Sequence, residues 1–334
     1  MSTPGPWVFH PHAGAWLALG AMVVLYVLGV RRAARAAGAA GRPTRRQCCA
    51  FAAGMAFVAL AGTWPLADLA AHWSLTALVV QRLVLTLAAA PLLLASLPSA
   101  LAAGLTRPAA VDVALDGITR PVVAVVVFSL VALGTLLPPA VAAQASSAGW
   151  RALTDGALLV AGAVLWGPAM HNIPGVHRNA PLGVAVYLFV QSIVPTFLAV
   201  IYVFAHRPFY GAFAGVHDAL GMSRLVDQQT AGVVAKVGTL PVLWTAAWRA
   251  LARAQRAEET GEDGEPLTWA EVERHLERAE RAERARLAGR RGLLGRHRAA
   301  GVVTAAPGGG APTPAGPEET EPHSATEDGG SGVP

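Results

Sequence analysis

Long apolar segments separated by short polar ones run along most of the chain. Seven of these segments come close to the roughly 20 residues that a helix needs to cross the hydrocarbon core of a bilayer. They lie at about 13–30, 48–68, 74–97, 121–143, 151–170, 182–205 and 226–248. The pattern predicts an all-α polytopic membrane protein whose seven-helix transmembrane domain occupies residues 1–248.

The pattern changes after residue 248, where charged residues become frequent. Residues 249–298 are predicted to contain a basic segment, a polar linker and a charged helix that opens with the capping box Thr268-Trp269-Ala270-Glu271. Residues 299–334 are rich in Gly, Pro, Thr and acidic residues, a composition typical of a disordered tail.

Arginines are distributed unequally between the two sides of the predicted bundle. The loops after the first, third and fifth spans hold nine arginines, whereas the loops on the other side hold at most three. Because cytoplasmic loops carry the excess of basic residues, we expect the N-terminus outside and the C-terminus in the cytoplasm. The first span does not resemble a signal peptide, since its basic residues follow the apolar run.

Composition supports this fold class and excludes several functions. Of the 334 residues, 54% are hydrophobic and only 14% are charged, against about 25% charged in an average soluble domain. The net charge of +5 reflects the arginine-rich loops, so we expect membrane lipid and not nucleic acid as a partner. The sequence contains no phosphate-binding loop, G-x-S-x-G or H-E-x-x-H motif, and we expect no enzymatic activity.

A few ionisable residues interrupt the apolar spans in the predicted outer half of the bilayer: Arg82, Asp155, Asp227 and Lys236. Each costs about 2.5–3.5 kcal/mol at a helix centre, so such residues normally face the bundle interior and find partners. One interpretation is structural, with Arg82 and Asp155 forming an ion pair between helices; Asp227 and Lys236 fall on opposite faces of one helix. The other is an outward-facing polar pocket, including Gln228, that holds an anion, a metal or a partner's side chain.

Histidines and cysteines offer a second set of candidates. His10, His12 and His72 are predicted on the outer face, where their imidazoles could gather a copper or zinc ion. Cys48 and Cys49 are the only cysteines, and adjacent cysteines point in different directions on a helix. We therefore expect them to be small buried residues and not a metal-binding pair.

The order of several motifs resembles the CtaG-type cytochrome c oxidase assembly family, which consists of seven-helix bacterial plasma-membrane proteins implicated in supplying copper to the oxidase. The similarity extends over about residues 7–248, and its most specific element is Asp227-Gln228-Gln229-Thr230-Ala231-Gly232. Weaker elements are Trp7, Tyr26-x-x-Gly29-Val30-Arg31-Arg32, Arg46-x-x-Cys49-Ala50-Phe51-Ala52-Ala53-Gly54, Trp64-Pro65-Leu66, Gln81 before Leu83-Val84-Leu85, and Ala90-Pro91-Leu92-Leu93.

The chain departs from the family where the family carries histidines. A His-x-x-x-His pair of the third helix is replaced by Leu78 and Arg82, and a pair of the fifth helix, before Trp166-Gly167-Pro168, falls near Arg151 and Asp155. Where the family has an apolar residue or Trp, this chain has Lys236. Guanidinium cannot deprotonate in a protein and is never a metal ligand, so the resemblance implies a divergent member that has lost the intramembrane copper site.

Three functions remain after these observations. The resemblance implies an oxidase assembly factor of the bacterial plasma membrane that contacts oxidase subunits or other copper-handling proteins, and acts in copper insertion or as a scaffold without the copper ligands. The alternatives are a small-anion transporter or channel that uses the polar pocket, and a membrane anchor or sensor whose output is the cytoplasmic helix.

Overall fold

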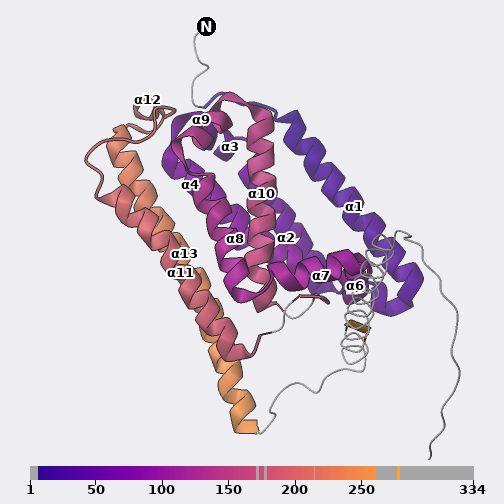
Figure 1. Ribbon diagram of the computed structural model, residues 1–334. Coiled ribbons are helices and arrows are strands. Elements are labelled where there is room, and N and C mark those ends of the chain that lie inside the picture. Colours follow the sequence, from indigo (N-terminus) through magenta and orange to yellow (C-terminus); the bar gives the residue numbers. More distant parts are fainter. Residues whose placement is uncertain (1–6, 171–172, 177–178, 214, 261–276, 279–334) are drawn as a thin grey trace, which may run out of the picture. The chain divides into compact units, whose positions relative to one another are not determined.

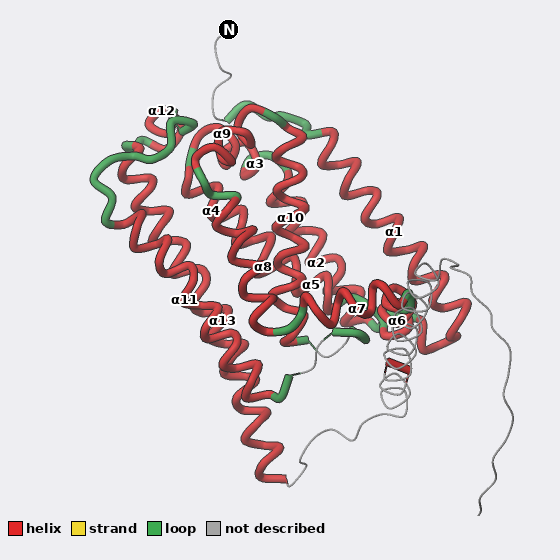
Figure 2. Tube along the Cα trace, viewed as in Figure 1, coloured by secondary structure: helices red, strands yellow, loops and turns green. Residues whose placement is uncertain are grey.

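A computed structural model describes residues 7–170, 173–176, 179–213, 215–260 and 277–278 (Figures 1 and 2). The chain divides into two units, residues 1–263 and 264–334. Everything that follows concerns the first unit. The predicted capping box and the predicted disordered tail lie outside the described residues.

The described part of the chain is helical and contains no strand. Its N-terminal half comprises α1 (Ala13–Ala37), the 3-10 helix η1 (Gly38–Gly41), α2 (Arg45–Gly62), α3 (Leu66–Asp68), the π-helix η2 (Leu69–Trp73), α4 (Leu75–Leu83), the π-helix η3 (Val84–Ala89), α5 (Ala90–Ala95), α6 (Ser99–Thr106) and α7 (Ala109–Ile118). Its C-terminal half comprises α8 (Pro121–Gly134), α9 (Pro138–Ser146), α10 (Ala148–Trp166), the 3-10 helix η4 (Gly167–Ala169), α11 (Pro181–Val203), α12 (Val216–Leu220) and α13 (Arg224–Thr260).

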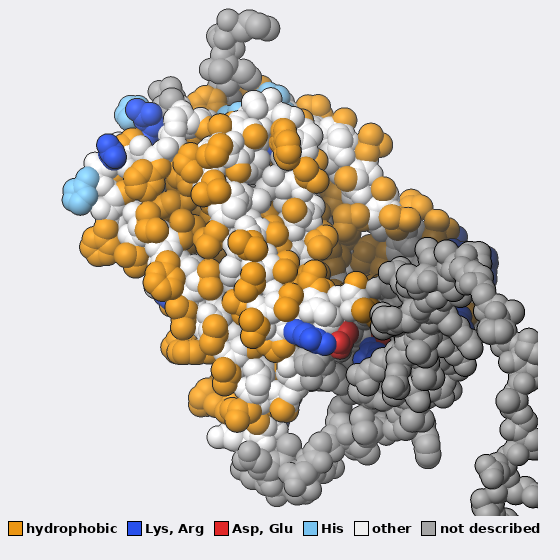
Figure 3. All heavy atoms as spheres, viewed as in Figure 1, with side chains coloured by type: hydrophobic (Ala, Val, Ile, Leu, Met, Phe, Trp, Pro, Cys, Tyr) orange, Lys and Arg blue, Asp and Glu red, His pale blue; other side chains and the backbone are white. Residues whose placement is uncertain are grey.

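The described residues contain five helices that are long and apolar enough to cross a membrane, or up to seven if each of two bent helix pairs forms one span. The five are α1, the continuous α4–η3–α5 segment, α10 with η4, α11 and α13. The bent pairs are α2 with α3 and η2, at 46°, and α7 with α8, at 83°. Each predicted span therefore has a helical counterpart, and many hydrophobic side chains lie on the face of the bundle shown in Figure 3.

The fourth predicted span was too long. The sequence suggested one helix over 121–143, but α8 ends at Gly134 and a separate α9 begins at Pro138. Pro138 and Pro139 lack backbone N–H groups, and a proline disfavours helical geometry in the residue before it. The segment predicted as a loop after the third span contains the two short helices α6 and α7.

Two close helix contacts depend on glycine. The most extensive pairing joins α11 and α13, and a Cβ on Gly232 would lie 2.8 Å from the carbonyl oxygen of Ala199. Likewise, a Cβ on Gly162 in α10 would lie 2.8 Å from Ala90 Cβ and 3.0 Å from Thr86. The α4–η3–α5 segment therefore lies in close contact with α10, and it also packs against α2 and α13. Small residues allow such approach where a larger side chain would hold two helices apart.

Candidate functional site

Arg82 has no carboxylate partner, although the sequence suggested an ion pair with Asp155. Its side chain is 6% exposed, and one guanidinium nitrogen donates to the Thr135 carbonyl and to Gln144 Oε1, both at 3.0 Å. Another nitrogen donates to the Thr135 hydroxyl. No nitrogen–oxygen contact within 4.0 Å joins Arg82 to Asp155 in the described part of the chain. The predicted direct pair is therefore wrong, because Thr135 at the end of α8 and Gln144 in α9 supply neutral acceptors instead.

Asp155 remains within electrostatic range of Arg82 and faces a different set of groups. Its Oδ2 accepts a long hydrogen bond of 3.5 Å from Gln81 Nε2, which also donates to the Ala61 carbonyl at 2.9 Å. Asp155 and Gln81 line a cavity of about 470 Å³ with Arg151 and His12, between α1, α2 and α10. This cavity brings together part of the predicted polar pocket, but Asp227, Gln228 and Lys236 do not line it.

Asp227 caps a neighbouring helix instead of lining a pocket. It is 1% exposed, and its carboxylate accepts hydrogen bonds from Ser74 Oγ at 2.7 Å, Leu75 N at 2.7 Å and Thr76 N at 3.2 Å. These donors form the first turn of α4, where backbone N–H groups lack partners within their own helix. A negative charge at this end also interacts favourably with the helix dipole. Asp227 thus fastens the start of α13 to the start of α4.

The glutamines that follow Asp227 hold the loop before α12. Gln228 Oε1 accepts from Phe209 N at 2.8 Å, and Gln229 Nε2 donates to the Ala205 carbonyl at 3.3 Å. Tyr210 in the same loop donates to the Leu136 carbonyl at 2.6 Å, and burial raises the pKa of its phenol, which keeps the donor protonated. The most specific motif of the sequence therefore has a structural role in this chain: its side chains join the start of α13 to α4 and to the loop before α12.

Lys236 lies apart from Asp227 on the same helix. Its ammonium donates to the hydroxyl of Thr196 in α11, and its side chain is half-buried. The ion pairs among the described residues involve His10, His12 and Arg120, so Lys236 contacts no carboxylate there. The sequence argument that Asp227 and Lys236 face different ways agrees with these contacts.

His10 and His12 meet at an aspartate that the sequence analysis missed. His10 Nδ1 lies 2.8 Å from Asp68 Oδ2, and His12 Nε2 lies 3.0 Å from Asp68 Oδ1. His72 instead contacts the Arg151 guanidinium at 3.1 Å. Asp68 ends the short helix after Trp64-Pro65, a position that the sequence marks only as the end of a span.

These three histidines do not form a ready metal site. Among the residues that the structure describes, no group of three His, Cys, Asp or Glu side chains is arranged to hold a metal ion. His10 Nδ1 forms a hydrogen bond with Asp68, whereas the buried His12 Nε2 lies 3.0 Å from Asp68 Oδ1 without hydrogen-bond geometry. Cys48 and Cys49, expected to be buried, are both exposed at the start of α2, because the first turn of this helix is polar and largely solvent-accessible.

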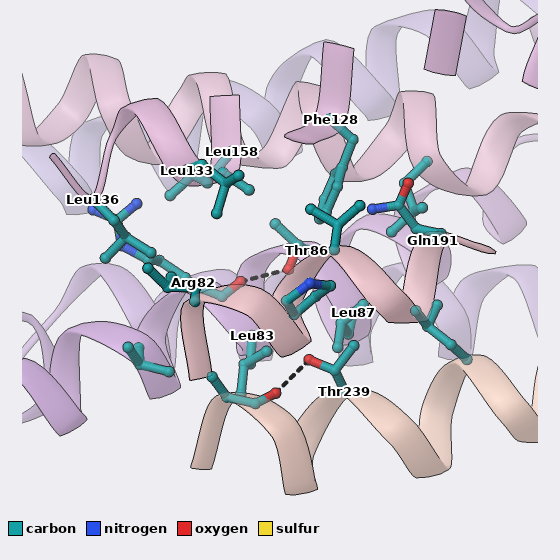
Figure 4. A pocket seen from close by; sticks show the side chains of 18 residues that line it. Arg82, Leu83, Thr86, Leu87, Phe128, Leu133, Leu136, Leu158, Gln191 and Thr239 are labelled. Carbon is teal, nitrogen blue, oxygen red and sulfur yellow. Dashed lines mark hydrogen bonds between the residues drawn. The ribbon is translucent and has the colours of Figure 1, made fainter. Parts of the chain in front are cut away.

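A second cavity, of about 80 Å³, lies in the bundle interior between α4, η3, α8, α10, α11 and α13 (Figure 4). Its walls are apolar apart from Arg82, Thr86, Gln191 and Thr239. The hydroxyls of Thr86 and Thr239 donate to backbone carbonyls of their own segments. Gln191 is 0% exposed, and neither its amide nitrogen nor its amide oxygen has a hydrogen-bond partner. Trp166 Nε1 donates to the Thr86 carbonyl at 3.0 Å.

At the positions where the resemblance implies histidines, the described residues are not arranged as a metal-ligand set. Leu78 is buried and apolar, Arg82 is a fixed cation, and Arg151 is engaged by His72. Asp155 is the single carboxylate among these positions, and its nearest hydrogen-bonding partner is an amide.

Comparison with known proteins gives one finding. No curated protein matches the chain, and no solved structure does either. A family model described as "Cytochrome c oxidase caa3 assembly factor (Caa3_CtaG)" matches residues 24–257, which run from within α1 to the last turn of α13. The chain therefore belongs to the cytochrome c oxidase caa3 assembly factor family.

Proposed function

We propose that this protein assists the assembly of cytochrome c oxidase in the bacterial plasma membrane, as a scaffold that contacts oxidase subunits and does not hold copper within its membrane-embedded core. Family membership supports the assembly role. The observation that carries the scaffold role is Arg82: a buried, permanently charged guanidinium stands where the resemblance implies a histidine. A cation at that position would repel a copper ion.

Copper delivery is the narrower version of the same role, in which copper is the cargo. His10, His12 and His72 are its candidate ligands, and the meeting of His10 and His12 at Asp68 favours a shared role for these two. Binding through the nitrogens that now face Asp68 would require the imidazoles to turn away from it. The family match gives no support to the alternative prediction of a small-anion transporter.

The test is a deletion strain in which cytochrome c oxidase activity of the membranes is measured. We expect activity to fall on deletion, to return with the wild-type chain, and to return equally with a variant carrying His10→Ala, His12→Ala and His72→Ala. Copper added to the medium should not replace the protein. Full rescue by copper, or failure of the triple variant alone, would instead support delivery of copper from the outer end. Unchanged activity in the deletion strain would contradict the assembly role.

A further inference from the structure

Lys236 lies near the middle of its membrane segment. It is the only lysine in the chain, twelve residues after Arg224 and thirteen before Arg249. At 1.5 Å per residue, each of these arginines is roughly 18–20 Å away along the helix. The extended lysine side chain spans only about 6 Å, so its ammonium cannot reach either interface by bending along the helix.

The contacts of Lys236 leave most of its charge uncompensated. An ammonium has three N–H donors, and one is directed to Thr196 Oγ1, which donates its own hydrogen to the Ser192 carbonyl at 3.2 Å. A hydroxyl is neutral and balances no charge. Because a lysine at mid-membrane depth costs about 2.5–3.5 kcal/mol, such residues normally pair with an acidic group.

The surface beside Lys236 is apolar and faces away from the bundle. Val233 and Val237 on α13 are 50% and 62% exposed, and Phe197 on α11 is 69% exposed. Further along the same two helices, Trp244 Nε1 of α13 donates to Ser192 Oγ of α11 at 3.3 Å. We name the exposed surface formed by Val233, Lys236, Val237, Thr196 and Phe197 the α11–α13 face.

We propose that the α11–α13 face binds a transmembrane helix of a partner membrane protein that carries an Asp or Glu side chain near its middle. The apolar residues would pack against the flanks of that helix, and its carboxylate would receive the two free N–H groups of Lys236. A lipid headgroup does not extend to this depth. A second copy of this chain is disfavoured because its embedded carboxylates already have partners: Asp227 caps α4, and Asp155 contacts Gln81.

This inference adds a contact surface to the proposed assembly role. It depends on that role only for the identity of the partner protein. It can be tested without an oxidase. The purified chain, labelled with a fluorophore at the exposed Cys48 and Cys49, is reconstituted in phosphatidylcholine vesicles with a Leu/Ala-based transmembrane peptide that carries a quencher. Peptides with a central Glu, Asp or Gln are compared, and association is read as quenching against peptide density in the membrane.

We expect the Glu and Asp peptides to associate with the wild-type chain about tenfold more tightly than the Gln peptide, since only a carboxylate compensates the ammonium. Lys236→Met should abolish this preference, and Lys236→Arg should retain it. Val160→Met, a change of an exposed residue on α10 and away from the α11–α13 face, serves as the matched control and should leave the preference unchanged. Circular dichroism verifies that the variants keep their helices.

Equal association of all three peptides with the wild-type chain would overturn the proposal, and so would a preference that survives in Lys236→Met. Self-association of the wild-type chain that is lost in Lys236→Met would identify a second copy as the occupant and would likewise overturn it. A positive peptide result together with unchanged oxidase activity in the deletion strain would leave this surface intact and contradict the assembly role alone.

Discussion

Asp227 and Lys236 lie nine residues apart on α13, and they use their charges in opposite ways. The carboxylate of Asp227 accepts three hydrogen bonds from the start of α4 and is almost completely buried. The ammonium of Lys236 has one neutral partner and lies beside exposed apolar residues. A charge whose contacts are complete inside the bundle stabilises the fold. A charge whose contacts are incomplete at membrane depth remains available to another molecule.

The largest expected effect in this comparison comes from Asp227. Asp227→Ala leaves Ser74 Oγ and two backbone N–H groups of α4 without their acceptor, and we expect a loss of about 3–5 kcal/mol of stability. Thr76→Val removes only the 2.9 Å bond to the Asp227 carbonyl and should cost about 1 kcal/mol. Unfolding in mixed micelles of increasing denaturing detergent measures both. Equal, small effects would show that Asp227 does not fasten α13 to the start of α4.

Arg82 should show the next largest effect. Arg82→Leu removes the donors to Thr135 and Gln144 and leaves Arg151 as the cation near Asp155, so we expect a loss of roughly 2 kcal/mol. Adding Asp155→Asn should recover part of this loss, because the carboxylate that lost the charge of Arg82 is then gone. The same unfolding measurement applied to the two single variants and the double variant gives the coupling between the sites. Strict additivity would mean that the two charges do not interact.

Gln191 should give a smaller effect of the opposite sign. Both polar atoms of its amide are buried without a partner in an otherwise apolar cavity, so Gln191→Leu should stabilise the protein by about 1 kcal/mol. Thermal unfolding followed by circular dichroism would register this as an increase in Tm. A decrease would show that the amide makes hydrogen bonds to water or to another molecule within the cavity.

The smallest stability effect is expected at Lys236. Lys236→Met loses one bond to a hydroxyl and relieves the cost of an embedded charge, so the free energy of unfolding of the isolated protein should change by less than about 1 kcal/mol. Oxidase assembly in cells should nevertheless decrease, because the partner helix loses its counter-charge. If Lys236→Met sharply lowered the free energy of unfolding as well as oxidase assembly, the result would contradict this expectation. It would show that Lys236, like Asp227, stabilises the fold.

The sequence predicted the helices well and their contacts poorly, for a physical reason. Apolar runs of sufficient length specify membrane segments directly, and five of the seven expected segments correspond to a single helix or a continuous helical segment, while the second is bent by 46° between α2 and α3. The fourth segment was predicted too long because the apolar run continues past Pro138, the residue at which the separate helix α9 begins. The identity of the charged positions was also predictable, since each such residue is costly in the membrane.

The partners of those charges were not predictable because they come from distant parts of the chain. Arg82 contacts Gln144 across 62 residues, and Asp227 contacts Leu75 across 152. Neither Thr135 nor Gln144 belongs to a motif, and Asp68 follows a span without any pattern that links it to His10. Opposite charge suggested the pairing of Arg82 with Asp155, whereas neutral carbonyl and amide groups already supply the hydrogen bonds that a guanidinium requires.

Our central claim is that this member of the oxidase assembly family uses its membrane-embedded charges as contacts and not as metal ligands. Copper stoichiometry tests it most directly: wild-type protein and the His10→Ala, His12→Ala, His72→Ala variant are loaded with Cu(I), dialysed against a weak chelator and analysed for metal. The account predicts no retained copper in the triple variant. One tightly held equivalent in that variant, sensitive to changes at Arg82, Asp155 or Asp227, would contradict it.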